Sequence, residues 1–367
     1  MTAPTRYELQ MSFVTPCFLK GVSDDTPELR APSVRGMLRW WLRAMLGGRR
    51  DLKGIQKIES SLFGESAGDS GRQGKVFVRV EQSAGPVIRR GTSPPDCQQD
   101  YTIRETSQGK DVRQNPIVYL GYGPYSYERG RGNITTRGAF AAGTSFAVHF
   151  LVRQRLTDGE GNALASAVWG LTRLGALGSR SRRGFGSVVL EPGGGADALF
   201  EELPSEDFRA AIPTPGLRSQ LLDGAALSPE FTALGGNTGL FRGPFHAKWQ
   251  DALGWLGKAW KDCRNDIRDR HGDKHRGNVR ALLGMPLQVA KQSGQKPSPV
   301  ELGKVERRAS PFLLRVSREG GKYIPLILAV PGVFHPEEQG KQADFERVFD
   351  EALAFFKKRE GVCQIWK

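Results

Sequence analysis

Hydrophobic positions recur with two different periods in the first half of this 367-residue chain. Alternating apolar and polar residues are typical of a half-buried strand, and apolar residues three or four positions apart are typical of a helix. On these patterns we expect strands at 7–14, 75–81, 144–153 and at the end of 175–190, and helices at 33–45, 52–63 and 162–174. The order strand, helix, strand, strand, helix, strand predicts a ferredoxin-like domain.

A change of composition separates the two halves. The stretch 192–215 contains three consecutive glycines, several prolines and a cluster of acidic residues, so we place a domain boundary there and divide the chain into 1–204 and 205–367. In the second half we expect strands at 230–234, 310–318, 323–330 and 362–366, helices at 245–271 and 343–359, and a hairpin turn at Glu319-Gly320-Gly321. The predicted class is α+β, with two ferredoxin-like (RRM-like, βαββαβ) domains in tandem.

The helix expected after Pro32 has an apolar stripe with a basic row beside it. Ser33 is placed to cap its first turn. The stripe consists of Val34, Leu38, Trp41, Leu42 and Met45, and the row consists of Arg35, Arg39 and Arg43. A row of planar guanidinium groups can hold phosphates, and Gly36 would let a partner approach the backbone closely. The alternative is an ordinary amphipathic helix with a solvated basic face.

The loop 178–186 has the sequence G-S-R-S-R-R-G-F-G, which favours anion binding. Glycines let the main chain approach a ligand, and successive N–H groups can form a concave anion site. We expect Phe185 to turn inward and pin the loop, and Gly184 to adopt a positive φ. The alternative is a tight arginine-rich turn. The motif is neither a Walker loop nor a dinucleotide fingerprint.

Two further stretches lack a clear period. Residues 82–115 are rich in Ser, Pro, Gly, Gln and Asp, and we expect a long loop, either functional or disordered. In 116–132, four tyrosines are interleaved with glycines and precede Arg129 and Arg131; they are Tyr119, Tyr122, Tyr125 and Tyr127. Such rings offer stacking platforms for unpaired bases. A Tyr/Gly-rich turn packed on its own domain is the alternative.

The charge of the chain points to a polyanionic partner. The formal net charge is +14 and the estimated pI is about 9.8, which favours nucleic acid or an anionic membrane surface. Nucleic acid is preferred because no segment approaches the roughly 18 apolar residues of a membrane span, and the first residues are too polar for a signal peptide. The four scattered cysteines fit neither a disulfide framework nor a zinc site, and we expect a cytoplasmic protein.

Several motifs together resemble one protein family. They are P-S-V-R-G-M-L-R-W-W-L-R-A, Y-L-G-Y-G, the glycine-rich loop, and in the second half K-H-R-G-N-V-R-A-L-L-G-M-P-L with E-R-R-A-S-P-F-L-L-R-V. The chain resembles the RAMP superfamily, and within it the family of the first subunit of the Cmr module of type III-B CRISPR effector complexes. The resemblance implies a non-catalytic subunit that holds the 3′ end region of the guide RNA and helps to capture target RNA beside other Cmr subunits.

In RAMP proteins the glycine-rich loop contacts the RNA backbone, so the resemblance implies the same here. The expected RNA-binding residues on the helix are Arg30, Arg35, Gly36, Arg39, Trp40 and Arg43, and those on the loop are Gly178, Arg180, Arg182, Arg183, Gly184, Phe185 and Gly186.

Candidate catalytic groups are few, and we expect no catalytic residue, no metal site and no cofactor. Motifs such as H-E-x-x-H and G-x-S-x-G are absent, the loop 15–30 contains no histidine, and His149 is expected in a core or half-buried position. The alternative is a metal-dependent CRISPR endoribonuclease that uses Asp24 or Asp25 in that loop. A free-standing RNA-binding protein is a weaker alternative, because the aromatic RRM strand motif is absent.

Overall fold

Two four-stranded antiparallel sheets form the framework of the part of the chain that the structure, a computed structural model, describes. That part comprises residues 5–66, 71–82, 85–105, 110–203, 206–222, 225, 231–272, 278–285, 288–289, 298–305 and 307–366. The first sheet contains β1 (Thr5–Phe13), β2 (Val76–Gln82), β9 (Ser145–Val152) and β10 (Val188–Leu190). The second contains β11 (Gly239–Arg242), β14 (Phe312–Glu319), β15 (Lys322–Ala329) and β16 (Cys363–Trp366).

Both sheets have the same order of strands. The first has the order β10-β1-β9-β2 and the second β16-β11-β15-β14, so each places its first strand between its fourth and its third. In both sheets the bonded neighbours are antiparallel. The expected α+β class is therefore confirmed, and so are the hairpin of β14 and β15 and its turn, in which Gly320 and Gly321 have φ values of 55° and 74°.

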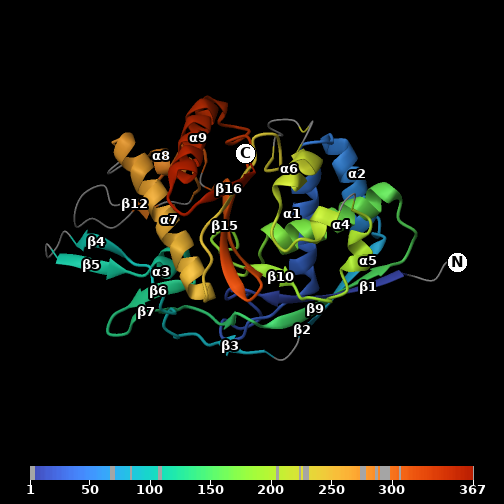
Figure 1. Ribbon diagram of the computed structural model, residues 1–367, viewed down its shortest axis with the longest axis horizontal. Coiled ribbons are helices and arrows are strands. Elements are labelled where there is room, and N and C mark those ends of the chain that lie inside the picture. Colours follow the sequence, from blue (N-terminus) through green and yellow to red (C-terminus); the bar gives the residue numbers. More distant parts are fainter. Residues whose placement is uncertain are drawn as a thin grey trace.

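Helices pack on each sheet, and Figure 1 shows the two groups side by side with β15 and β16 between them. The first group contains α1 (Ala31–Leu46), α2 (Leu52–Phe63) and α4 (Asp158–Leu174), and the second contains α7 (Trp249–Arg270) and α9 (Gln342–Lys358). The predicted apolar stripe of α1 is buried as expected. Among the described helices, none is both long and apolar enough to cross a membrane.

Smaller elements occupy the connections. They are β3 (Val87–Ile88), β4 (Tyr101–Glu105), β5 (Lys110–Gln114), α3 (Pro116–Leu120), β6 (Tyr125–Glu128), β7 (Gly132–Thr135), β8 (Ala139–Phe140), α5 (Asp197–Phe200), α6 (Pro215–Leu222), α8 (Asn278–Ala281), β12 (Gln288–Val289) and β13 (Ser298–Pro299). The expectation of an irregular loop over 82–115 was wrong, because β4 pairs with β5 and β3 pairs with β8. These pairs lack an apolar period because they lie outside the two main sheets.

Two helices begin at positions that differ from the predictions. α1 begins at Ala31 with Arg30 as its N-cap residue, and no described side chain caps it, so the prediction for Ser33 was wrong. Pro32 suits the first turn of a helix, which lets α1 begin earlier. α7 begins at Trp249 instead of 245, because the backbone of His246 pairs with that of Tyr323 at 2.9 Å in both directions.

The strand predicted at 230–234 is also wrong for its described residues, 231–234, which are irregular. The Leu234 N–H donates to the Ala44 carbonyl near the end of α1 at 2.8 Å, and both Ala233 and Leu234 are buried. The apolar residues of this stretch therefore cover the end of α1, and β11 takes the place of the first strand in the second sheet.

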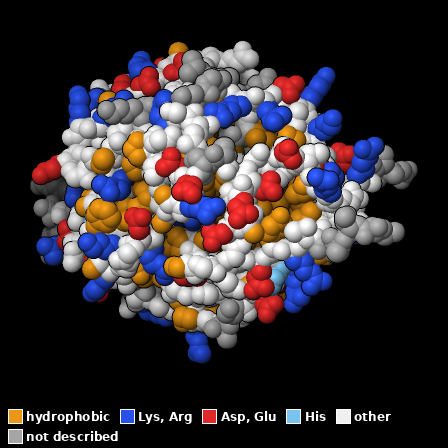
Figure 2. All heavy atoms as spheres, turned by 45° about the vertical axis from the view of Figure 1, so that its right-hand side comes forward, with side chains coloured by type: hydrophobic (Ala, Val, Ile, Leu, Met, Phe, Trp, Pro, Cys, Tyr) orange, Lys and Arg blue, Asp and Glu red, His pale blue; other side chains and the backbone are white. Residues whose placement is uncertain are grey.

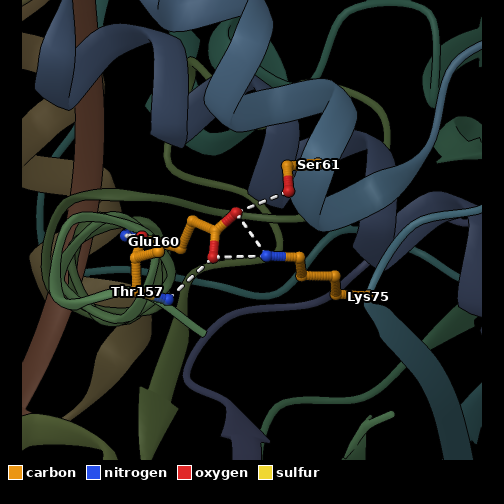
Figure 3. Close-up of polar contacts among 4 residues, drawn as sticks. All are labelled: Ser61, Lys75, Thr157 and Glu160. Carbon is orange, nitrogen blue, oxygen red and sulfur yellow. Dashed lines mark hydrogen bonds and ion pairs between the residues drawn. The ribbon is translucent and has the colours of Figure 1, made fainter. Parts of the chain in front are cut away.

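Glu160 fastens the start of α4 to its neighbours (Figure 3). It forms a capping box with Thr157, and its carboxylate also accepts hydrogen bonds from Lys75 Nζ at 2.8 Å and from the Ser61 hydroxyl. Burial raises the pKa of Glu160, but the bonds from Lys75, Ser61 and Thr157 outweigh it and bring the pKa down to about 2. One carboxylate thus links α4, α2 and the residue before β2.

The two halves share their cores. Leu240, Leu313 and Trp366 of the second half belong to the core of the first sheet, and Phe18 and Phe185 of the first half belong to that of the second. Arg315 on β14 is 2% exposed and donates to carbonyl groups of the first half; these are Leu171, Thr172, Gly175 and Val188, at 2.6 to 3.3 Å. Residues 204 and 205, where we predicted the boundary between domains, lie outside the described residues.

Candidate nucleic-acid interface

The basic row of α1 is partly occupied by an acid. Arg39 Nε lies 2.6 Å and Arg43 Nε 2.5 Å from the carboxylate of Glu59 on α2, which is 5% exposed. Burial raises the pKa of Glu59, but hydrogen bonds from Arg43 and Arg39 outweigh it and hold the pKa below its usual value. Glu59 therefore neutralises one of the two charges of Arg39 and Arg43, and Arg35 is exposed. That this row holds phosphates stays a prediction. The sequence contains a sign of this buried acid, because Glu59 lies four residues after Ile55 and so falls on the apolar stripe of its helix.

The remaining residues of α1 lie where a ligand could reach them. Arg30 and Gly36 are exposed, and no described atom lies within 4 Å of the position that a β-carbon at Gly36 would take. Arg35 and Arg39 line a pocket of about 550 Å³ beside β2. Trp40 is half-buried, and the guanidinium of Arg182 lies 5.1 Å from the centre of its ring. The helix and the glycine-rich loop therefore meet at Trp40.

The glycines of the loop 178–186 serve its internal packing. Gly178, Gly184 and Gly186 have φ values of 82°, 84° and 64°. A β-carbon at Gly184 would lie 2.6 Å from Leu253 Cδ1 on α7, and at Gly178 it would lie 2.7 Å from the Phe18 carbonyl oxygen. The positive φ at Gly184 is confirmed, and so is the inward position of Phe185, which is fully buried. Gly184, Phe185 and Gly186 hold the loop in shape from inside, and its arginines form the surface offered to a ligand.

The three arginines of the loop have different partners. Arg180 is exposed. Arg182 donates to the Ser310 carbonyl at 2.6 Å, and burial lowers its pKa to about 10. Arg183 lies 4.8 Å from the ring centre of Trp260, and its Nη1 atom is buried with no hydrogen-bond partner among the described residues. Burial and the neighbouring charge of Arg264 lower the pKa of Arg183 to about 9. An anion here would supply the missing acceptor.

A pocket of about 330 Å³ lies at the junction of the two halves, and we call it the junction pocket. Its described lining residues are Tyr119, Leu120, Arg180, Ser181, Arg182, Arg183, Trp260, Arg264, Gly284, Met285, Arg308, Ala309 and Ser310. They include five arginines and no carboxylate. Sequence reasoning missed Arg264, Arg308 and Trp260 as site residues. For Arg308 the signal was present, because it lies in the E-R-R-A-S-P motif.

The tyrosines of 116–132 divide between the two interpretations. Tyr125 is buried against Phe18 and Phe185, as in a packed turn. Tyr122 and Tyr127 are 65% and 72% exposed, as stacking platforms require. Tyr119 lines the junction pocket. Outside this region, His149 is half-buried between Glu8 and Glu81, as predicted.

Comparison with known proteins identifies the family. Residues 10–189 match the model of the RAMP superfamily. The CRISPR system Cmr subunit Cmr1-2 of Pyrococcus furiosus is 30% identical over 189 residues, which are 48% of this chain and 91% of that protein. This chain belongs to the Cmr1 family.

A further relative and a solved structure from the same organism match almost the whole chain. Cmr subunit Cmr1-1 is 25% identical over 365 residues, which cover 95% of this chain and 94% of that protein. The crystal structure of Cmr1 in its apo form has 21% identity and a TM-score of 0.58 and covers 99% of both chains. The likeness to that structure shows that this Cmr1-family chain has the same overall fold.

The loop 15–30, which contains Asp24 and Asp25, shows no cluster of metal ligands among its described residues. Asp24 and Asp25 are exposed, and Asp24 Oδ1 lies 3.0 Å from Lys20 Nζ. The hydrogen bond and the charge of Lys20 lower the pKa of Asp24. Among the described residues, no group of three or more His, Cys, Asp or Glu side chains is placed to hold a metal ion. Asp24 is therefore engaged with a lysine on its own loop.

Proposed function

We propose that this chain is a non-catalytic RNA-binding subunit of a cytoplasmic type III-B CRISPR (Cmr) effector complex. It holds the 3′ end region of the guide RNA and helps to capture target RNA, next to other Cmr subunits. The observation that carries the proposal is the junction pocket, where five described arginines face one cavity whose described lining contains no acid. Guanidinium groups bind phosphates with paired hydrogen bonds, and the two relatives compared above are Cmr subunits.

The proposal includes the architecture of the chain, which we assign to two ferredoxin-like domains in tandem that divide near residues 204 and 205. The support is the shared strand order, in which the first strand lies between the fourth and the third in both sheets. The glycine-rich loop of the first domain then docks on the edge of the second, where the Leu314 N–H donates to the Arg182 carbonyl at 3.1 Å. The RNA site lies between the domains.

The test is the salt dependence of single-stranded RNA binding. Arg180→Gln should weaken binding to all sequences and make the slope of log affinity against log salt shallower by about 0.7, the value for one phosphate contact. Glutamine keeps a polar side chain but removes the charge, on the same backbone, whose φ is 62°. The matched control is Arg347→Gln on α9, an exposed arginine paired with Asp344, which should bind normally. Equal slopes in the wild type and Arg180→Gln would contradict the proposal.

Incubation with RNA in Mg²⁺ or in EDTA separates this function from an endoribonuclease. We expect no cleavage in either condition. Cleavage that requires Mg²⁺ and disappears in Asp24→Asn or Asp25→Asn would replace the proposal with the metal-dependent nuclease.

A further inference from the structure

Helix α7 borders two cavities, and both are basic. Trp260 and Arg264 line the junction pocket, and Lys258, Lys261 and Arg268 line a second cavity of about 630 Å³ beside β4. Its other described lining residues are Asp100, Tyr101, Thr102, Asp262 and Asn265. We call this cavity the α7 pocket. In Figure 1, α7 and the β4–β5 hairpin lie on the left.

Tyr119 and Lys261 form the wall that the two pockets share. Tyr119 lines the junction pocket, and Lys261, which lines the α7 pocket, has its Nζ atom 5.0 Å from the centre of the Tyr119 ring. The same Nζ lies 5.5 Å from the ring of Tyr101, and the two rings meet edge to face at 6.1 Å. The two pockets therefore lie next to each other, with these two side chains between them.

The acids of the α7 pocket are already paired. Asp262 binds Lys258 at 3.0 Å and Arg359 at 2.9 Å, and Asp100 binds Arg113 at 3.2 Å. Lys261 contacts aromatic rings and has no carboxylate partner among the described residues. Burial lowers the pKa of Lys261 most, and the charges of Arg264, Arg268 and Arg280 lower it further, to about 8. An anion at this place would stabilise the charged form of Lys261.

We propose that the α7 pocket is a second single-stranded RNA site, which receives the nucleotides next to those held in the junction pocket. This inference rests on the proposed function. A cation beside aromatic rings is the combination that binds unpaired nucleotides, since the cation meets a phosphate and a ring can meet a base. An acidic protein segment would match the charge as well, but the shared wall favours one continuous polyanion that fills both pockets.

The test compares RNA oligonucleotides of two lengths on the full chain. We use about 4 and about 16 nucleotides, the range that single-strand sites span. Lys261→Gln should weaken binding of the long RNA about fivefold and make its salt slope shallower by about 0.7, and leave the short RNA unchanged. Lys261→Arg should restore most of the loss. The control is Lys357→Gln, the same change on the exposed face of α9, which should bind both RNAs normally.

Each other outcome has a defined meaning, provided that thermal melts show Lys261→Gln to be folded. Equal binding of the long RNA by Lys261→Gln and the wild type would overturn the α7 pocket and leave the junction pocket standing. Equal weakening of both RNAs would also overturn it, because Lys261 would then act on the junction pocket through Tyr119. Failure of the wild type to bind either RNA would overturn the proposed function itself. A final comparison uses polyglutamate in place of RNA. If polyglutamate binds the wild type more tightly than the long RNA does, and Lys261→Gln weakens that binding, the α7 pocket would belong to an acidic protein.

Discussion

Glu59 decides how much of the positive charge of α1 is available to a ligand. Its carboxylate neutralises part of the charge of Arg39 and Arg43 and fixes both side chains against α2. Removal of either arginine therefore takes a partner from the buried Glu59 carboxylate as well as a charge from a basic surface, which costs stability. Arg35 and Arg180 are exposed, so they report on ligand binding with less effect on the fold.

Gly184→Ala should destabilise the protein. The left-handed backbone at φ 84° costs a β-carbon about 1–2 kcal/mol, and the 2.6 Å approach to Leu253 adds about 1–3 kcal/mol of overpacking. RNA affinity of the folded fraction should stay near that of the wild type, because the β-carbon would meet Leu253, and neither Gly184 nor Leu253 is among the described residues that line the junction pocket. Urea denaturation and RNA titration measure the two effects separately.

Two further variants test this account of Gly184→Ala: one is a control, and the other separates backbone strain from overpacking. Ser181→Ala in the same loop should change stability by less than about 0.5 kcal/mol. In a Leu253→Ala background, Gly184→Ala should cost less than it does alone, because the overpacking is gone while the strain remains. A loss of RNA affinity in folded Gly184→Ala would mean that the backbone at Gly184 meets the RNA.

The burial of a side chain could be predicted from the sequence, but its partners in other elements could not. The buried stripe of α1 and the inward Phe185 follow from local patterns of apolar residues. The ion pair of Glu59 and the place of Arg308 in the junction pocket depend on how separate elements pack, and no local period reports that.

At the scale of elements, most strands and helices of the two sheet layers were predicted, and several with ends within one residue, such as α2 and α9. The exceptions have partners elsewhere in the chain. The start of α7 is set by the backbone pair of His246 with Tyr323, and the loss of a strand at 231–234 is set by the bond from Leu234 to Ala44. Both partners are far away in the sequence. The hairpin of β4 and β5 was missed because it belongs to neither main sheet and needs no apolar alternation.

The hydrogen bonds of the Glu160 carboxylate predict that the stability of the protein depends on pH. Its pKa is about 2 in the folded protein, below the ordinary 4.5, so its carboxylate stabilises the fold above pH 4.5, and this contribution is lost as the pH falls toward 2. Glu160→Gln should cost about 1.5–3 kcal/mol at neutral pH, the range for bonds to a charged group, and the difference from the wild type should shrink below pH 4.5.

Urea denaturation of both proteins over that pH range measures the difference. Glu337→Gln, at an exposed position before α9, is the control and should match the wild type throughout. A cost for Glu160→Gln that is the same at every pH would mean that the shape of the side chain, and not its charge, holds the start of α4.

At the scale of the molecule, the basic side chains behind the net charge of +14 are unevenly distributed. The face in Figure 2 carries acidic, basic and hydrophobic side chains close together, so it forms no continuous basic surface. In the junction pocket, five described arginines face one cavity. Composition predicted a polyanionic partner, but only the packing of the two halves brings Arg180, Arg264 and Arg308 together.

The shared cores predict that the whole chain unfolds in one transition. Arg315 of the second half links the two halves, because its buried guanidinium donates to four backbone carbonyls of the first half. Arg315→Ala should lower the free energy of unfolding by about 3 kcal/mol, since a buried carbonyl that loses its donor costs about 1–3 kcal/mol, although the Leu171 carbonyl keeps the Gly175 N–H at 3.1 Å. It should shift the single transition to lower temperature without dividing it.

Arg318→Gln is the control on the same strand: its half-buried pair with Glu191 is worth about 1 kcal/mol or less. Calorimetry decides, because equal calorimetric and van't Hoff enthalpies indicate one cooperative unit, and two separate peaks in the wild type would show that the halves fold independently.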